Sequence, residues 1–309
     1  MTQAWDIIPD IHADIRRLQT TLDGLGDDAP FAFLGDFIDA GHNQSTADDA
    51  AVLTTVRDLV ARNKAVAVMG NHELNAMLFH ATGPDGAPLR THSDKNTDQH
   101  RSFIAQFGIA TPEAQLWLDW FITLPLWLDL GGIRLVHACW NQTDIDVVAQ
   151  RRPSGLLEPE DLSEIAADKT PFARAVKNLT NGPELKLPEG VRFHDFKGYP
   201  REHVRIAWWR SHAATWRDAA LSVKNLTELP DAALSRASDV SLYPADAPPV
   251  FTGHYKMSGE PRVEAPRALC LDYPNTPCAY RWRGEEDLRQ GNLVTFDEEQ
   301  QSHKGSFGG

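Results

Sequence analysis

Residues 31–39 read FAFLGDFID, an apolar run that passes directly into a glycine and two aspartates. Two neighbouring runs, 4–9 and 65–69, end in the same way, in the polar segments Asp10-Ile11-His12 and Gly70-Asn71-His72-Glu73. Short apolar runs bounded by glycine and polar residues predict buried strands that lead into loops. Because the sites of layered α/β domains form at the carboxyl ends of the strands, we expect these polar side chains to meet.

Helices are expected between these strands, at 13–25 and 46–62, which completes a βαβ pattern. Farther along, 102–107 and 113–122 predict helices, and 126–130 with 133–136 predicts a hairpin turning at Gly131-Gly132. Four late strands are expected at 250–252, 268–273, 278–282 and 293–296. The chain at 78–100 reads as a polar loop, and 300–309 reads as a loose tail. We interpret the chain as one domain, 1–309, with an irregular insertion or cap at about 142–247.

Composition narrows the classes of function. The chain has 309 residues, and its 30 basic and 43 acidic residues give a net charge of −13. This charge repels phosphate backbones and anionic lipid, so neither a nucleic-acid polymer nor a membrane is expected as a partner. Three cysteines without a C-x-x-C pair favour a reducing compartment, and the N-terminus does not resemble a signal peptide. We therefore expect a cytoplasmic protein.

Two later histidines, His137 and His254, also follow apolar runs. Each polar group alone is typical of a turn, a helix cap or a satisfied core histidine. Buried together, however, the aspartates would repel one another, and a divalent cation would remove that cost. The mixture of carboxylate, amide and imidazole suits Mn, Fe or Zn. Two ions that share a carboxylate would use all six candidate ligands: Asp10, His12, Asp36, Asn71, His137 and His254.

The order D-x-H, G-D-x-x-D, G-N-H-E, H and G-H resembles the calcineurin-like metallophosphoesterases. It is most similar to the branch that holds the PPP-type serine/threonine phosphatases and the diadenosine tetraphosphatases. The resemblance covers about 4–140 and 250–275. It implies a four-layer α/β/β/α sandwich of two mixed sheets flanked by helices.

The resemblance also implies roles for the motif residues. Asp10 and His12 would hold one metal, Asp36 would bridge both ions, and Asn71, His137 and His254 would hold the second. The metal-bridged hydroxide would attack phosphorus, and His72, oriented by Asp39, would protonate the leaving oxygen. Two divalent ions are implied, with Mn²⁺ preferred and Fe or Zn as alternatives.

The sequence departs from the family pattern at three places. Pro9 and Ala13 flank the first motif, where glycines are usual. Ala40 stands where the family places an arginine that grips the substrate phosphate. Arg205 and Arg210 are our candidates to replace it, because a guanidinium suits phosphate. The cluster of His80, Arg90, His92, Lys95 and His100 reads either as a solvated loop or as the lining of a substrate channel.

The leading interpretation is a metal-dependent phosphoesterase of the serine/threonine protein phosphatase kind. An alternative is a dinucleoside polyphosphate hydrolase, for which Trp140, Trp208 and Trp209 are candidates to stack a base. A second alternative is a non-catalytic metal-binding regulatory module. A nuclease is disfavoured by the charge and by the absence of a G-H-x-H ending. The expected substrate is accordingly a phosphoprotein or a dinucleoside polyphosphate.

Overall fold

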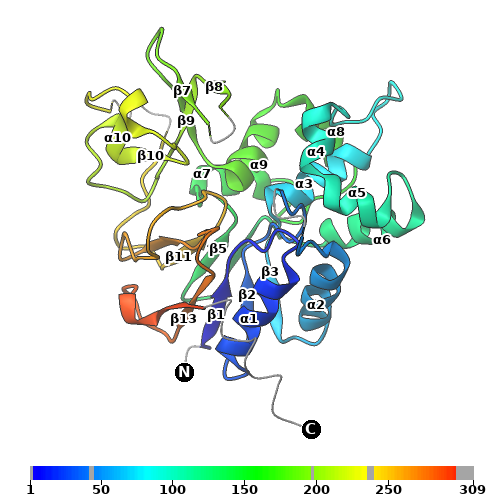
Figure 1. Ribbon diagram of the computed structural model, residues 1–309, viewed down its shortest axis with the longest axis horizontal. Coiled ribbons are helices and arrows are strands. Elements are labelled where there is room, and N and C mark those ends of the chain that lie inside the picture. The colour runs from blue at the N-terminus through cyan, green and yellow to red at the C-terminus, as the bar shows by residue number, and fades with distance from the viewer. Residues whose placement is uncertain (1–2, 42–44, 196–197, 235–239, 297–309) are drawn as a thin grey trace.

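The first of two mixed β-sheets has the strand order β14-β13-β1-β2-β3 (Figure 1). The structure is a computed structural model, and it describes residues 3–41, 45–195, 198–234 and 240–296. The strands of this sheet are Trp5–Ile8 (β1), Phe31–Phe33 (β2), Ala65–Ala67 (β3), Cys278–Trp282 (β13) and Leu293–Thr295 (β14). β1, β2 and β3 run parallel, whereas β13 is antiparallel to β1 and to β14. The three parallel strands therefore end at one edge, as the sequence predicts.

The second sheet has the order β12-β11-β5-β4. Its strands are Trp127–Asp129 (β4), Arg134–Val136 (β5), Val250–Thr252 (β11) and Ala268–Cys270 (β12). β4 and β5 form the predicted hairpin, and β11 pairs in parallel with both β5 and β12. More than a hundred residues of chain separate β5 from β11. Their pairing therefore brings the last motif, which contains His254, beside the fourth motif, which is His137.

The two sheets face each other across a buried layer. Period-two alternation puts one face of each strand into this layer. Its members come from both sheets and include Ile7, Ala32, Leu135, Phe251 and Tyr280, all fully buried. The outer faces pack against helices in a larger cluster. Figure 1 shows α1 and α2 beside the first sheet, and α7 and α9 beyond the second. This arrangement confirms the predicted four-layer fold.

The helices around the first sheet mostly follow the prediction. They are Ile15–Leu25 (α1), Asp49–Ala61 (α2), Asn71–His80 (α3), Asp94–Gln99 (α4), Arg101–Phe107 (α5) and Pro112–Phe121 (α6). The prediction of a polar loop over 78–100 was wrong at α4 and at the end of α3. Ser93 caps α4, because its hydroxyl accepts from the Asn96 amide, but the helix buries none of its residues. A helix without an apolar stripe leaves no periodic signal.

The segment 142–247 is more regular than expected. It contains the helices Gln142–Ala149 (α7), Asp161–Ala167 (α8), Pro171–Asn181 (α9) and Trp216–Ala219 (α10), and the 3₁₀ turn Leu226–Glu228 (η1). Its short strands are Glu184–Lys186 (β6), Phe193–His194 (β7), Pro200–Arg201 (β8), His203–Ile206 (β9) and Ala220–Leu221 (β10). A further 3₁₀ turn, Gln290–Asn292 (η2), precedes β14. α9 begins with a Thr170 cap and Pro171 at its first position, a start signal that the sequence interpretation overlooked.

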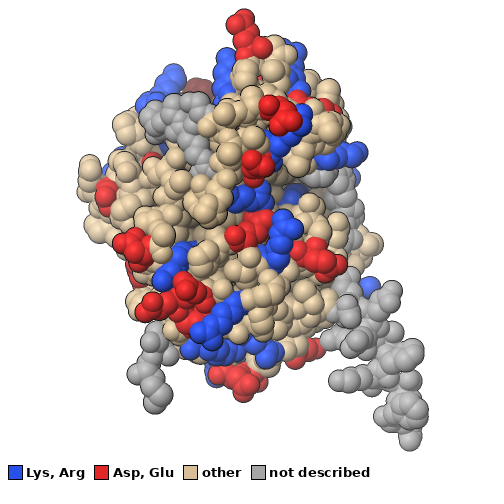
Figure 2. All heavy atoms as spheres, turned by 90° about the vertical axis from the view of Figure 1, so that its left-hand side faces the viewer, with Lys and Arg blue, Asp and Glu red and all other residues tan. Residues whose placement is uncertain are grey.

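Two surface observations bear on the partners. On the face in Figure 2, Lys and Arg side chains are interspersed with Asp and Glu, so the negative charge is not gathered into a single patch there. Over the part of the chain that the structure describes, no helix is both long and apolar enough to cross a bilayer. The expected tail at 300–309 lies outside the described residues.

Candidate active site

Every predicted ligand lies within a few residues of the end of a strand, and these segments converge. Asp10 and His12 follow β1, Asp36 follows β2, and Asn71 begins α3 after β3. The second sheet adds the remaining two ligands, His137 after β5 and His254 after β11. The structure thus brings all six side chains to one place.

Three short contacts link four of these ligands. Asn71 Oδ1 lies 2.7 Å from His254 Nδ1 and 3.0 Å from His137 Nε2. His137 Nε2 is also 3.3 Å from Asp36 Oδ2. Atoms that bind one ion at about 2.1 Å lie at such separations from one another.

The hydrogen bonds of His137 are those of a residue that could bind a metal. Its Nδ1 is 2.7 Å from the carbonyl oxygen of Leu34, which can only accept, so Nδ1 carries the proton. A neutral ring then aims the lone pair of Nε2 at two oxygens, those of Asn71 and Asp36. Burial lowers the pKa of His137, but Asp36 and Asp10 outweigh burial and raise it to about 10. Without a metal the ring would therefore carry a second proton. A divalent ion between these atoms would replace that proton.

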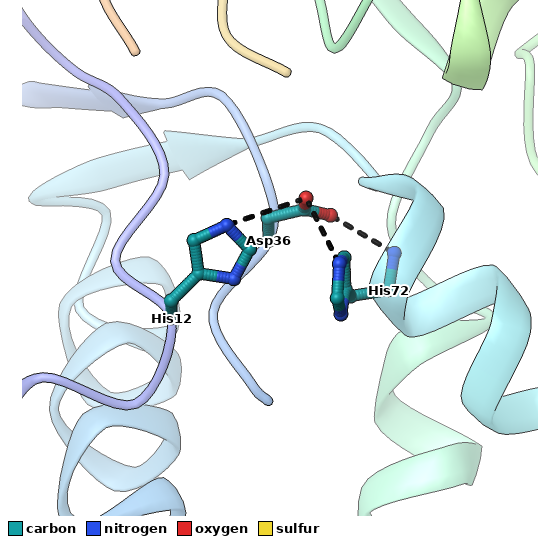
Figure 3. Close-up of side chains that lie close together, drawn as sticks. All are labelled: His12, Asp36 and His72. Atoms are coloured by element: carbon teal, nitrogen blue, oxygen red, sulfur yellow. Dashed lines mark hydrogen bonds and ion pairs between the residues drawn. The ribbon is translucent and has the colours of Figure 1, made fainter. Parts of the chain in front are cut away.

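The other half of the ligand set is more open. His12 Nε2 lies 4.0 Å from a carboxylate oxygen of Asp10 and 4.0 Å from one of Asp36. Figure 3 shows His12 and His72 on opposite sides of the Asp36 carboxylate. Burial, aided by His72, lowers the pKa of His12 to about 4, which leaves the ring neutral and able to bind a metal. The two possible ligand groups, His12–Asp36–His72 and Asp36–His137–His254, share Asp36.

The electrostatics also favour cations in the site. Burial, with Asp272 and Asp36 nearby, raises the pKa of Asp10 well above its usual range. The backbone amide of His254 donates to the Asp10 carboxylate at 3.0 Å, which ties the first loop to the last. The carboxylate, amide and imidazole donors present here fit a pair of borderline divalent ions.

Glu73 holds the loop that carries Asp36. It is fully buried, and its carboxylate accepts from the backbone amides of Asp36, Phe37 and Gly70 at 2.8–2.9 Å. This role was missed in the sequence, although the G-N-H-E motif contains the residue. Asp272, near Asp10, accepts from the backbone amide of Lys256.

His72 has a partner at each ring nitrogen. Its Nδ1 is 2.6 Å from Asp39 Oδ2, which is the predicted pair, and its Nε2 lies 3.8 Å from Asp36 Oδ2. Gln99 Nε2 is 3.3 Å from His72 Nε2. Gln99 Oε1 accepts a hydrogen bond from Arg90. Burial works against a charged His72, but Asp36 and Asp39 outweigh it and raise the pKa to about 9. Since the Gln99 amide group donates toward Nε2, a proton at this nitrogen, beside the ligand set, requires the Gln99 side chain to turn away.

Asp39 has a second histidine partner that the sequence did not reveal. His100 Nδ1 is 2.7 Å from Asp39 Oδ1, and the ring is almost completely buried. The sequence placed this histidine in a basic cluster without distinguishing it from its neighbours. No local pattern could have done so, because the contact joins residues 61 positions apart.

The two arginines proposed to replace the missing one at Ala40 differ in position. Burial lowers the pKa of His254, and the charge of Arg205 contributes to this; Arg205 Nε itself lies 3.5 Å from Glu184 Oε1. The structure places Arg210 elsewhere: its Nε and Nη2 bind the carboxylate of Glu264 at 2.9 and 2.8 Å, and its Nη1 donates to the Asp218 carbonyl. Ala40 is buried, and its amide donates to Ser102.

Solved structures of other proteins share the fold of this chain. A serine/threonine phosphatase from Saccharomyces cerevisiae has a similar structure (13% identity, TM-score 0.50, covering 96% of this chain and 80% of that one). So does a cold-active protein tyrosine phosphatase (16% identity, TM-score 0.51, covering 96% and 79%). A third, assigned only provisionally as a diadenosine tetraphosphatase, has 14% identity and a TM-score of 0.46, covering 96% and 95%. At these identities the likeness to the first two shows a shared fold.

No curated protein matches the sequence closely enough to count as a relative. Residues 6–211, however, match the sequence profile of the calcineurin-like phosphoesterases. This range contains five of the six converging ligands together with the His72–Asp39 pair, and His254 joins them through β11. Since the match spans two thirds of the chain and the ligands that it contains meet in space, the chain belongs to the calcineurin-like phosphoesterase family and is a hydrolase of phosphoester bonds.

Proposed function

We propose that this phosphoesterase hydrolyses phosphomonoesters in the manner of the serine/threonine protein phosphatases, with two divalent ions and Mn²⁺ as the preferred metal. The observation that carries the proposal is the His72–Asp39 pair at the edge of the ligand set. An acid placed there suits a substrate whose leaving oxygen needs a proton, as a seryl or threonyl oxygen does.

Each residue of the site has a proposed role. Asp10, His12 and Asp36 would hold one ion, and Asp36, Asn71, His137 and His254 the other. When bound, the ions would polarise the phosphoryl oxygens and lower the pKa of water. His72 would hold a proton on Nε2 and pass it to the leaving oxygen, while Asp39 would keep the ring in place through Nδ1. Arg205 would bind the phosphate, since its charge is near enough to affect the pKa of His254.

The alternative substrate, a dinucleoside polyphosphate, needs an accessible aromatic face for its base. The three tryptophans suggested for this role are buried, with exposures of 7% for Trp140, 0% for Trp208 and 4% for Trp209. Trp208 also donates its indole N–H to the Ala138 carbonyl at 3.0 Å, which fixes the ring inside the core. These three rings therefore offer no stacking surface, and the phosphomonoester is the favoured substrate.

A cytoplasmic location is proposed as well. Cys139, Cys270 and Cys278 are all free and buried, and burial raises the pKa of each thiol. Thiols kept in this state are usual in a reducing compartment.

The test is phosphate release by metal-free protein resupplied with Mn²⁺, with p-nitrophenyl phosphate, a phosphoserine peptide and diadenosine tetraphosphate as parallel substrates. We expect the peptide to be preferred over the dinucleotide. Asp36→Asn should lose metal-dependent turnover, and His72→Ala should lose about 10²- to 10⁴-fold on the peptide. His194→Ala, at an exposed histidine, is the matched control and should keep full activity. Preference for the dinucleotide, or turnover that survives Asp36→Asn, would contradict the proposal.

A further inference from the structure

The cluster behind the catalytic pair begins at Asp39, whose two carboxylate oxygens serve two different histidines. Oδ2 is 2.6 Å from His72 Nδ1, and Oδ1 is 2.7 Å from His100 Nδ1. Asp39 also donates its own backbone amide to Asp49 Oδ1 at 3.0 Å. The backbone and both oxygens are thus engaged, so the carboxylate has no freedom to rotate away from His72.

His100 is itself held rigidly. Its ring is 1% exposed and stacks on Phe103, with centroids 4.7 Å apart and planes inclined by 16°. Phe79 meets the same ring edge to face at 5.3 Å. A side chain packed on both sides in this way can act as a fixed support for Asp39.

The direction of the hydrogen bonds follows from a backbone amide. His80 Nδ1 lies 3.5 Å from the amide nitrogen of Ala110, which can only donate, so His80 carries its proton on Nε2. His80 Nε2 is 3.2 Å from His100 Nε2 and donates to it. His100 therefore keeps its proton on Nδ1 and donates to Asp39. Burial, with His100 and His92 nearby, lowers the pKa of His80 to about 4, which agrees with a neutral His80.

We infer that His100, supported by His80, is a positioning residue for the general acid: it fixes the Asp39 carboxylate so that Asp39 can hold His72 toward the leaving oxygen. His100 does not touch the substrate. The inference rests on the proposed function, because it concerns how well His72 donates a proton. It assigns a purpose to two histidines of the basic cluster that the metal site does not use.

Leaving-group dependence separates this role from a general structural one. 2,4-Dinitrophenyl phosphate and phenyl phosphate carry the same phosphoryl group, but only the second has a leaving oxygen that needs a proton. We expect His100→Leu, which removes the donor, to lower kcat on phenyl phosphate about tenfold or more and to change kcat on 2,4-dinitrophenyl phosphate by less than about threefold. His100→Asn, which retains an N–H near the position of Nδ1, should recover most of the loss.

Two further variants keep the test decisive. His80→Phe leaves every contact of Asp39 in place, so it should show the same selectivity with a smaller loss even if His100→Leu does not fold. His194→Ala is the matched control at an exposed histidine. Equal losses on both esters, or no recovery with His100→Asn, would overturn the inference. If the wild-type protein hydrolyses neither ester while binding Mn²⁺, the proposed function itself fails.

Discussion

At the scale of single residues, the first loop of the site stores backbone strain. His12 and Ala13 have φ values of +50° and +58°, in the left-handed region that favours glycine. Ala13 is fully buried, and its amide donates to the Phe37 carbonyl, so the second loop holds it in this conformation. Strained positions of this kind cluster at functional sites.

Ala13→Gly is expected to relieve this strain and to raise the free energy of unfolding by up to about 1 kcal/mol, since glycine adopts a positive φ at little cost. Urea denaturation of the metal-loaded protein measures the change. Ala51→Gly, in the regular helix α2, is the control and should lower stability by about 1 kcal/mol. A loss of stability at Ala13 as large as at Ala51 would show that the left-handed conformation costs the alanine nothing.

A second residue-scale prediction concerns pH. Asp49 is fully buried, and burial raises its pKa to about 6. A carboxyl group whose pKa is higher in the folded state contributes stability below about pH 4, and that contribution is lost as the pH rises to 6. The loss is on the order of 3 kcal/mol.

Asp49→Asn should therefore remove the part of the pH dependence that falls between pH 4 and 6 and should be the more stable variant at pH 7. The amide oxygen can still accept from the Asp39 amide. Urea denaturation of both proteins from pH 4 to 7 tests this, with Asp129→Asn on the surface as the control. Parallel stability curves for Asp49→Asn and the wild-type protein would contradict the assignment.

At the scale of elements, close backbone approach decides which residues the loops can contain. A Cβ atom at Gly253 would lie 1.8 Å from Asp10 Oδ1, and one at Gly70 would lie 2.2 Å from Asp36 Oδ1. The glycines after β11 and β3 thus let two ligand carboxylates sit against the backbone of other loops. This explains why glycine precedes the ligand at both places.

Gly253→Ala is accordingly expected to displace the Asp10 carboxylate and to weaken Mn²⁺ binding by about 10- to 100-fold, the usual effect of disturbing the surroundings of metal ligands. Titration of metal-free protein with Mn²⁺, followed calorimetrically, gives the affinity. Gly291→Ala is the matched control, because a Cβ there meets no atom within 4 Å. Unchanged affinity in Gly253→Ala would show that Asp10 tolerates displacement or is not a ligand.

At the scale of the whole molecule, Arg210 joins the segment at 142–247 to the loop after β11 through its paired bonds with Glu264. Trp209 donates its indole N–H to the same carboxylate at 3.1 Å. We propose that this segment is a cap on a single domain. The contacts of Arg210 and Trp209 with Glu264 support this proposal. Arg205 and Arg210, five residues apart, therefore have different expected roles.

Arg205→Gln should raise KM for a phosphoester about tenfold or more, since one charge-assisted contact with phosphate would be lost. Arg210→Gln should leave KM within about threefold and lower the free energy of unfolding by about 1–3 kcal/mol, because the half-buried Glu264 loses two charge-assisted hydrogen bonds. Steady-state kinetics and urea denaturation of both variants separate the two effects. The opposite pattern, a raised KM in Arg210→Gln alone, would restore Arg210 as the phosphate ligand.

Local signals in the sequence determined the core of this protein. Apolar runs, glycines and caps predicted the strands β1 to β5 and β11 to β14, and the motif residues after them predicted the ligand set. These features depend on neighbours within about ten residues, so they can be read from the order of the chain.

Only the tertiary structure decided the rest. The pairing of β11 with β5, the second histidine on Asp39 and the contact of Arg210 with Glu264 join residues from 54 to more than a hundred positions apart. The polar helix α4 was missed because it has no apolar face to mark it. Contacts across such separations are selected by packing and by the satisfaction of buried polar groups, which depend on the complete fold and leave no periodic pattern in the chain.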